Sequence, residues 1–252
     1  RAKGDAHRFR FVGRERGYHG MNIGCVSVGG MVNNVKTFAS ILMPGVQHMR
    51  HTHLPEHKFV SGQPETGGDL ANDLERIASN FGPENIAACI VEPIAGSTGT
   101  LVPPKGYLQK LREICDKHGI LLIFDEVITG WGRTGSSFAS IEYGVTPDIM
   151  TMAKATTNGV VPMGVVACKD EIYDSVMDAS PMGSVELFHG YTYSGIPVAV
   201  AAALAVQDIF EKEDIFNRAK NLAPYFQKGL FSLQDLESVE NIRGYGMMGG
   251  ID

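Results

Sequence analysis

Residues 120–126 of this 252-residue chain read ILLIFDE, and this stretch decides the fold. Five consecutive apolar residues, Ile120–Phe124, are too few for an ordinary helix and are typical of a parallel strand buried on both faces. The segment before it, residues 107–119, places apolar side chains at positions 107, 108, 111, 114 and 115 and ends in His118-Gly119, a common helix terminus. The stretch therefore predicts a helix that leads into a buried strand.

The same alternation extends along most of the chain. Residues 86–91 form a second continuous apolar run, and helical spacing from Leu70 to Phe81 follows Asp69, a predicted N-cap. The other predicted elements are weaker strands at 149–153 and 165–167 and helices at 198–210 and 215–233. The first sixty residues are less regular. The β-α-β order predicts an α/β fold with a mostly parallel sheet.

Composition excludes several classes of protein. Apolar residues make up 44% of the chain, charged residues 20%, and the formal net charge is −6. This mild acidity argues against nucleic acid and anionic membranes as partners and indicates a solvated acidic surface. The longest apolar run, residues 196–206, is shorter than the roughly 20 residues that span a bilayer.

Cysteine usage predicts a reducing compartment. Cys25, Cys89, Cys115 and Cys168 are scattered and form no C-x-x-C pair, so we expect neither a disulfide framework nor a zinc site. The opening residues, Arg1-Ala2-Lys3-Gly4-Asp5, do not resemble a signal peptide, and none is expected. These features favour a cytoplasmic protein.

Charged residues follow three of the predicted strands. Glu92 comes after the first apolar run, Asp125 after the second, and Lys154 after the weaker strand at 149–153. Ligands of open α/β sheets bind at the carboxyl ends of the strands. We therefore expect these three side chains to meet at one edge of the sheet.

A P-loop ATPase domain is one alternative, because an acid after a buried strand can bind magnesium. Its partner motif is G-x-x-x-x-G-K-[ST], and the nearest match runs from Gly30 to Thr37 with Val35 in place of the second glycine. A β-branched residue is a serious fault where the backbone must wrap phosphate.

Two G-x-G-x-x-G stretches and a histidine cluster give weaker signals. Residues 130–135 are separated from the strand by five residues, and residues 244–249 leave no room for a following helix. Both are predicted to be turns. The four histidines between residues 48 and 57 lie in a proline-bounded loop without supporting cysteines or paired acids, so no metal site is predicted.

Residues 122–135, LIFDEVITGWGRTG, followed by PDIMTMAK at 147–154, closely resemble the signature of class III aminotransferases. ERGYHG at 15–20, VEPIAG at 91–96, PPKGYL at 103–108 and HGYTYSG at 189–195 resemble further family blocks in family order. This resemblance implies a three-layer α/β/α domain, the large domain of fold-type I enzymes that use pyridoxal 5′-phosphate. It assigns residues 1–252 to that cofactor-binding domain.

The resemblance also implies the cofactor site. Lys154 would bind the cofactor aldehyde as a Schiff base and then move the substrate proton, a pair of roles that needs an amine. Asp125, 29 residues earlier, would keep the ring nitrogen protonated. Val127, expected on the same strand face as Asp125, would lie under the ring.

Four further residues complete the implied site. Tyr18 would stack on the other ring face with His19 beside it, and Glu92 would help to hold the Asp125 side. Thr192 would reach across a dimer interface to the partner's cofactor phosphate, which implies a homodimer or a dimer of dimers.

Ser97 indicates which branch of the class III family the chain resembles. Ornithine and γ-aminobutyrate members carry a glutamate at this position, whereas Ala95-Gly96-Ser97 resembles enzymes that transfer amino groups from ω-amino acids such as β-alanine to pyruvate. A class III aminomutase or decarboxylase is the runner-up. The upstream phosphate-binding loop and the small domain with its carboxylate-binding arginine are not recognised, so the chain is expected to be part of a longer protein.

Overall fold

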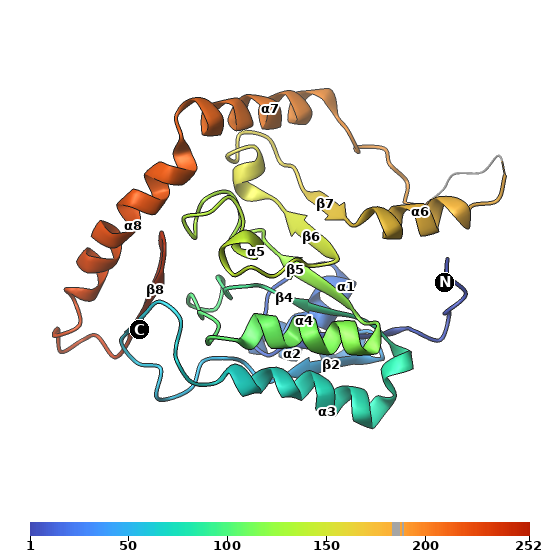
Figure 1. Ribbon diagram of the computed structural model, residues 1–252, viewed down its shortest axis with the longest axis horizontal. Helices are drawn as coiled ribbons and strands as arrows, with labels where there is room; N and C mark the ends of the chain where they lie inside the picture. The colour runs from blue at the N-terminus through green and yellow to red at the C-terminus, as the bar shows by residue number, and fades with distance from the viewer. Residues whose placement is uncertain (183–186, 188) are drawn as a thin grey trace.

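A six-stranded sheet forms the centre of the computed structural model, which describes residues 1–182, 187 and 189–252 (Figure 1). Its strand order is β2-β1-β4-β5-β6-β7, and all neighbours run parallel except β6 and β7. The strands are β1 Arg10–Arg14, β2 Val46–Met49, β4 Ile86–Val91, β5 Leu121–Asp125, β6 Ile149–Met152 and β7 Val165–Cys168. The predicted mostly parallel α/β sheet is confirmed.

A smaller sheet of three strands lies at the carboxyl-terminal end of the chain. It has the order β3-β8-β9, with β3 at Val60–Ser61, β8 at Ile242–Tyr245 and β9 at Met248–Ile251. The turn between β8 and β9 contains Gly246, whose φ of +58° suits glycine. Residues 244–249 therefore contain the end of β8, a hairpin turn and the start of β9, which agrees with the predicted turn.

Helices cover the main sheet unequally. Helices α3 (Asn72–Phe81) and α4 (Tyr107–His118) lie side by side over one face (Figure 1). The short helix α1 (Ile23–Val28) contacts β1 and β2, and its Cys25 and Val28 line a groove with Ile90 and Ile123 on the opposite face. Both faces thus carry helices, as in a three-layer fold.

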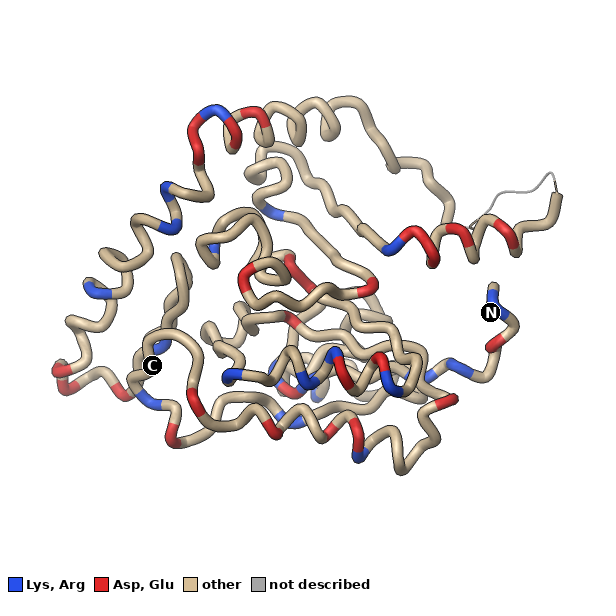
Figure 2. The backbone as a smooth tube through the Cα atoms, viewed as in Figure 1, with Lys and Arg blue, Asp and Glu red and all other residues tan. Residues whose placement is uncertain are grey.

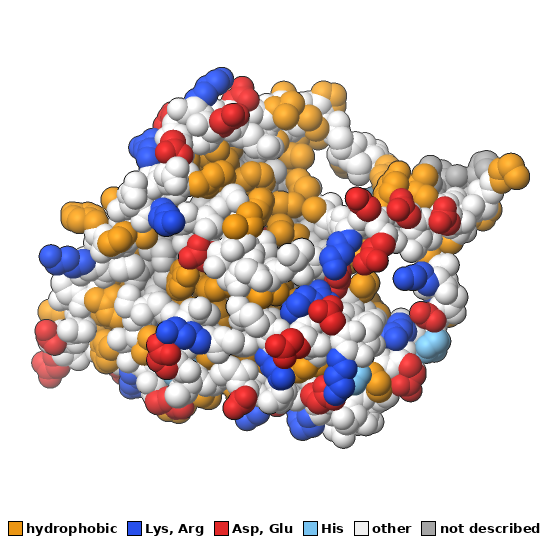
Figure 3. Space-filling model, viewed as in Figure 1, with side chains coloured by type: hydrophobic (Ala, Val, Ile, Leu, Met, Phe, Trp, Pro, Cys, Tyr) orange, Lys and Arg blue, Asp and Glu red, His pale blue; other side chains and the backbone are white. Residues whose placement is uncertain are grey.

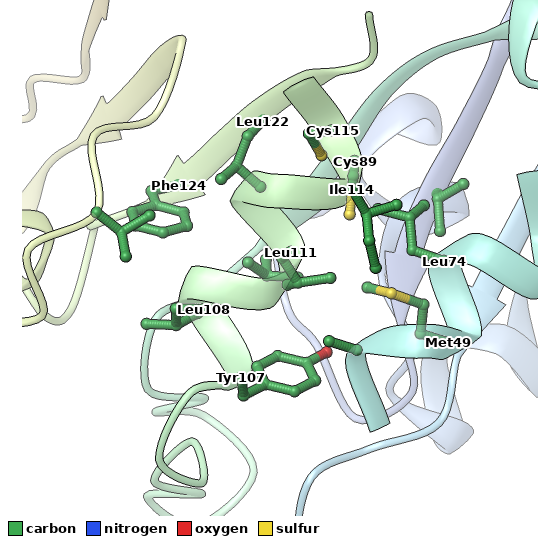
Figure 4. Packing of buried hydrophobic residues seen from close by; sticks show 14 of the residues in the cluster. Met49, Leu74, Cys89, Tyr107, Leu108, Leu111, Ile114, Cys115, Leu122 and Phe124 are labelled. Atoms are coloured by element: carbon green, nitrogen blue, oxygen red, sulfur yellow. The ribbon is translucent and has the colours of Figure 1, made fainter. Parts of the chain in front are cut away.

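The hydrophobic core lies between the sheet and the α3–α4 pair. Leu74 from α3, Leu111 from α4, and Leu122 and Phe124 from β5 are all completely buried (Figure 4). Because side chains alternate along a strand, Ile123 points to the other face and is only half-buried. This one-sided core anchors β4 and β5, whose ends carry Glu92 and Asp125.

The last two long helices extend beyond the sheet as an arm (Figure 1). They are α7, Pro197–Lys212, and α8, Ile215–Phe231. The remaining helices are α2 Val32–Thr37, α5 Ala139–Glu142 and α6 Asp170–Asp178, with 3-10 turns at Ala39–Ile41, Gly68–Ala71, Pro83–Asn85 and Lys154–Thr156. Among the described residues, the structure shows no helix of the length and apolarity needed to cross a bilayer.

Two sequence predictions about element ends are wrong. Asp69 does not cap α3, because residues Gly68–Ala71 form a tighter 3-10 turn and the helix begins at Asn72. Val127 does not lie on β5, which ends at Asp125, so its placement does not follow from strand alternation. It lies in the turn behind the strand, where its backbone N–H donates to Oδ1 of Asp125 over 3.0 Å.

Candidate active site

Three neighbouring parallel strands bring Glu92, Asp125 and Lys154 to one cavity. Strands β4, β5 and β6 are adjacent, and each of these residues lies at or just beyond the carboxyl end of its strand. The cavity has a volume of about 150 Å³ and also contains Tyr18 and His19 in its wall. The expected convergence at the sheet edge is therefore present in the fold.

Asp125 has both carboxylate oxygens occupied. Oδ2 lies 2.8 Å from Nδ1 of His19, and the two side chains are only 7% and 2% exposed. Oδ1 accepts the N–H of Val127. A carboxylate oxygen accepts a hydrogen bond from Nδ1–H, so this contact fixes the ring orientation of His19. The pair gives the cavity a buried, precisely held carboxylate.

Glu92 organises the backbone around the cavity. Oε1 accepts the N–H of Tyr18 and Oε2 accepts the N–H of Gly96, each over 2.9 Å. Burial raises the pKa of the Glu92 carboxyl, and the two N–H donors, His19 and Arg14 act in the opposite direction. Glu92 therefore holds the backbone at Tyr18 and at Gly96, whereas the side chain that contacts Asp125 is His19.

Arg14 is a neighbour of the site that the sequence reasoning missed. It ends β1, is 1% exposed, and donates from Nη2 to the backbone oxygen of Glu92 over 2.8 Å. Its guanidinium also lies 5.8 Å from the centre of the Tyr107 ring. The sequence signal that could have found Arg14 is its position at the end of a strand, four residues before Tyr18.

Lys154 opens a short 3-10 turn directly behind β6. Its φ of +48° lies in the left-handed region, which is unfavourable for a residue with a Cβ. The N–H groups of Thr157 and Gly159 donate to its backbone oxygen over 3.4 and 3.2 Å. The surrounding turn therefore holds the lysine in a conformation it would not otherwise favour.

Thr192 lies apart from the other predicted site residues. It lines a separate, larger cavity of about 880 Å³, formed by residues 162–166 and residues 189–196 with the start of α7. Within this chain the structure thus brings together six of the seven predicted residues and leaves Thr192 elsewhere.

Glu126 supports the loop that follows Asp125. Its carboxylate is completely buried and accepts hydrogen bonds from the Thr129 hydroxyl and from the N–H groups of Ala139 and Ser140, over 2.7 to 2.9 Å. Burial raises the pKa of this carboxyl, and these donors lower it. Glu126 thus ties both ends of the 126–140 loop together, which keeps Val127 against the cavity.

The features that suggested other functions are turns and surface loops. Gly30 lies against the backbone of residues 14–16, where an added Cβ would approach the Arg14 oxygen to 2.2 Å, and only the six-residue α2 follows. Gly132 and Gly135 have positive φ and face α8. Within the described ranges, no three histidine, cysteine or acidic side chains gather in a way that could hold a metal ion.

The mostly parallel α/β sheet has the architecture of fold-type I transferases, and the cavity at its edge is lined by a lysine and a buried carboxylate. The family model for class III aminotransferases matches residues 1–252, and the chain belongs to this family. Enzymes of this family depend on pyridoxal 5′-phosphate. The P-loop ATPase alternative is thereby set aside.

Named relatives are similar over the whole chain. It is 53% identical to an omega-aminotransferase of Caulobacter vibrioides and 49% identical to a beta-alanine–pyruvate aminotransferase of Pseudomonas aeruginosa, covering 57% and 56% of these proteins. An omega transaminase of Pseudomonas jessenii, solved in complex with PMP, is 35% identical and superposes with a TM-score of 0.91, with 55% of its chain covered. The chain thus spans about half the length of the relatives it matches.

Proposed function

We propose that this protein transfers an amino group from an ω-amino acid or related amine, such as β-alanine, to pyruvate or a related keto acid. The observation that carries the proposal is that Lys154 and the buried Asp125–His19 pair line one cavity. The names of the similar proteins from Caulobacter vibrioides and Pseudomonas aeruginosa support the choice of donor and acceptor.

The cavity suits pyridoxal 5′-phosphate because it offers an amine and a carboxylate from adjacent strands. When bound, the cofactor supplies an aldehyde that bonds to amines and a pyridinium ring that accepts electrons. Lys154 would hold it through Nζ and, once displaced by substrate, would accept and return the proton of the substrate carbon. This double role requires the free amine to stay within reach of that carbon.

The other residues of the site would bind and orient the cofactor. Asp125, held by His19 and the Val127 N–H, would place its negative charge beside the ring nitrogen and favour the protonated form. Tyr18 and Val127 would enclose the two ring faces. Glu92 would act through the backbone, since its carboxylate fixes the Tyr18 and Gly96 segments.

We also propose that residues 1–252 form the cofactor-binding large domain of a cytoplasmic enzyme that works as a homodimer or a dimer of dimers. The start of α7 carries no Lys, Arg, Asp or Glu, as Figure 2 shows, and hydrophobic side chains gather along this helix and below it (Figure 3). Val198, Leu204 and Tyr193 are 58%, 60% and 82% exposed. A second copy that covers this surface would bring Thr192 to its cofactor phosphate.

Product analysis tests the proposal. Full-length protein would be incubated with pyridoxal 5′-phosphate, β-alanine and pyruvate, with the Lys154→Ala variant as the matched control. We expect the wild-type protein to form alanine and to consume pyruvate, and the variant to form none. Release of carbon dioxide or isomerisation of the donor without pyruvate consumption would contradict amino transfer and indicate a decarboxylase or an aminomutase.

A further inference from the structure

Trp131, the one tryptophan of the chain, connects the loop behind β5 to the turn that contains Lys154. Its indole Nε1–H donates to the hydroxyl of Thr156 over 3.0 Å. Thr156 is the third residue of the 3-10 turn that Lys154 opens, and it is only 2% exposed. Trp131 therefore holds a hydroxyl that lies only two residues along the chain from Lys154, the proposed catalytic residue.

The Thr156 hydroxyl passes the restraint to the backbone before Lys154. It accepts from Trp131 and donates to the backbone oxygen of Ala153 over 3.0 Å, and the Thr156 N–H donates to the same oxygen over 3.0 Å. These bonds close the turn around Lys154, whose left-handed backbone needs outside support. Without the indole, the hydroxyl is free to rotate toward other acceptors.

The indole ring itself is held firmly. It stacks on Phe210 of α7 with a centroid distance of 5.7 Å and meets the edge of Phe138 at 5.1 Å. The backbone N–H of Trp131 donates to the oxygen of Ser137 over 2.6 Å. Ring packing fixes the indole, and the hydrogen bond transmits its position, so the two contributions can be separated by mutation.

We propose that Trp131 is a positioning residue for Lys154, because its N–H fixes the Thr156 hydroxyl and thereby the turn that directs the lysine amine into the cavity beside Asp125. This inference rests on the proposed role of Lys154. Trp131 itself does not line the cavity of Asp125 and Lys154, so it acts through the turn.

Four single variants separate the hydrogen bond from the packing. Trp131→Phe keeps an aromatic ring and removes the donor, whereas Thr156→Val keeps the shape of the side chain and removes the hydroxyl, which accepts from Trp131 and donates to Ala153. Thr156→Ser keeps the hydroxyl and serves as the conservative rescue. Phe210→Leu removes the stacking partner on α7 but leaves the hydrogen bond, which makes it the matched packing control.

The experiment measures how fast Lys154 captures pyridoxal 5′-phosphate in full-length protein, by borohydride quenching at set times and peptide mapping. We expect Trp131→Phe to slow capture about fivefold, the effect of one neutral hydrogen bond, and Thr156→Val to slow it at least as much because it also loses the bond to Ala153. The double variant should be no slower than Thr156→Val alone. Thr156→Ser and Phe210→Leu should match the wild type. Unfolding midpoints without cofactor check that each variant is folded, and Thr156→Val alone carries the test if Trp131→Phe does not fold.

Two results would overturn the inference. Capture at the wild-type rate in both Trp131→Phe and Thr156→Val would remove any positioning role, and an equal loss in Phe210→Leu would assign the effect to ring packing. Failure of the proposed role of Lys154 is distinguishable, since the wild-type protein would then carry no label on Lys154, and failure of amino transfer alone would leave the label in place and show only in the product analysis.

Discussion

His19 and Asp125 form a buried pair at the centre of the site, with Nδ1 of the imidazole 2.8 Å from Oδ2 of the carboxylate. The two residues lie 106 positions apart and come from the segment behind β1 and from the end of β5. Because the second oxygen of Asp125 is also occupied, the carboxylate has a fixed orientation. A fixed negative charge is what a cofactor ring nitrogen needs to stay protonated.

Asp125→Asn should reduce amino transfer by at least about a hundredfold, because loss of a buried charge from a paired site costs about 3 kcal/mol or more. The amide keeps the shape and can still accept from His19, so borohydride-trapped cofactor should persist. Asp235→Asn, on the exposed surface, is the control. A variant Asp125→Asn with more than a tenth of wild-type turnover would show that this charge is not needed.

Glu126 should make the folded state less stable as the pH rises. Burial raises the pKa of this carboxyl above its ordinary 4.5, so the folded protein holds the proton more tightly than the unfolded chain. The free energy of unfolding should therefore fall as the pH climbs from about 4.5 to the raised pKa, by at most about 1.4 kcal/mol per pH unit. Denaturant titrations across this window measure the slope.

Glu126→Gln should flatten that slope, since the amide does not ionise, whereas Glu237→Gln on the surface should leave it unchanged. Glu92 has a pKa raised in the same direction and remains in both variants, so part of the decline should persist. Equal slopes in Glu126→Gln and in the wild type would show that Glu126 stays ionised throughout.

Gly13→Ala should destabilise the strand that leads to the site. An added Cβ would approach the backbone oxygen of Val28 to 1.9 Å, and neither β1 nor the end of α1 can yield without moving the segment before Tyr18. Overpacking of this kind costs about 3 kcal/mol. Gly229→Ala in α8 meets no atom within 4 Å and should stabilise the protein by about 0.5 to 1 kcal/mol. Urea unfolding of both variants provides the comparison.

Thr192 offers a test of the second subunit. Thr192→Val should weaken cofactor binding about tenfold, the loss of one charge-assisted hydrogen bond to phosphate. A mixed dimer of Thr192→Val and Lys154→Ala subunits would contain one site with both native residues. At cofactor concentrations too low to load the Thr192→Val homodimer, the mixed dimer obtained by co-expressing both variants should regain activity. No gain over the parent dimers would place Thr192 in the site of its own subunit or in neither.

The central strands and the charged residues at their ends could be predicted from the sequence because their signals are local. Continuous apolar runs predicted β4 and β5, and the rule that ligands bind at strand ends predicted the meeting of Glu92, Asp125 and Lys154. The roles of the residues came from the resemblance to class III aminotransferases.

Contacts between distant segments were not predictable in this way. Nothing in the local sequence says that the Tyr18 N–H reaches Glu92 or that Trp131 donates to Thr156, since the first pair meets only after β1 aligns with β4 and the second only after β5 aligns with β6. The start of α3 was misplaced because Gly68–Ala71 forms a 3-10 turn that packs against α4, a tertiary effect on a local pattern.

Borohydride reduction of the full-length protein with pyridoxal 5′-phosphate, followed by peptide mapping, tests the assignment of Lys154 most directly. Reduction makes the lysine–cofactor bond permanent, so the modified residue can be identified by mass. We expect the label on Lys154 in the wild type and none at that position in Lys154→Ala, with Lys169 unlabelled as an internal control. Label on another lysine, or its absence from folded full-length protein, would contradict the account.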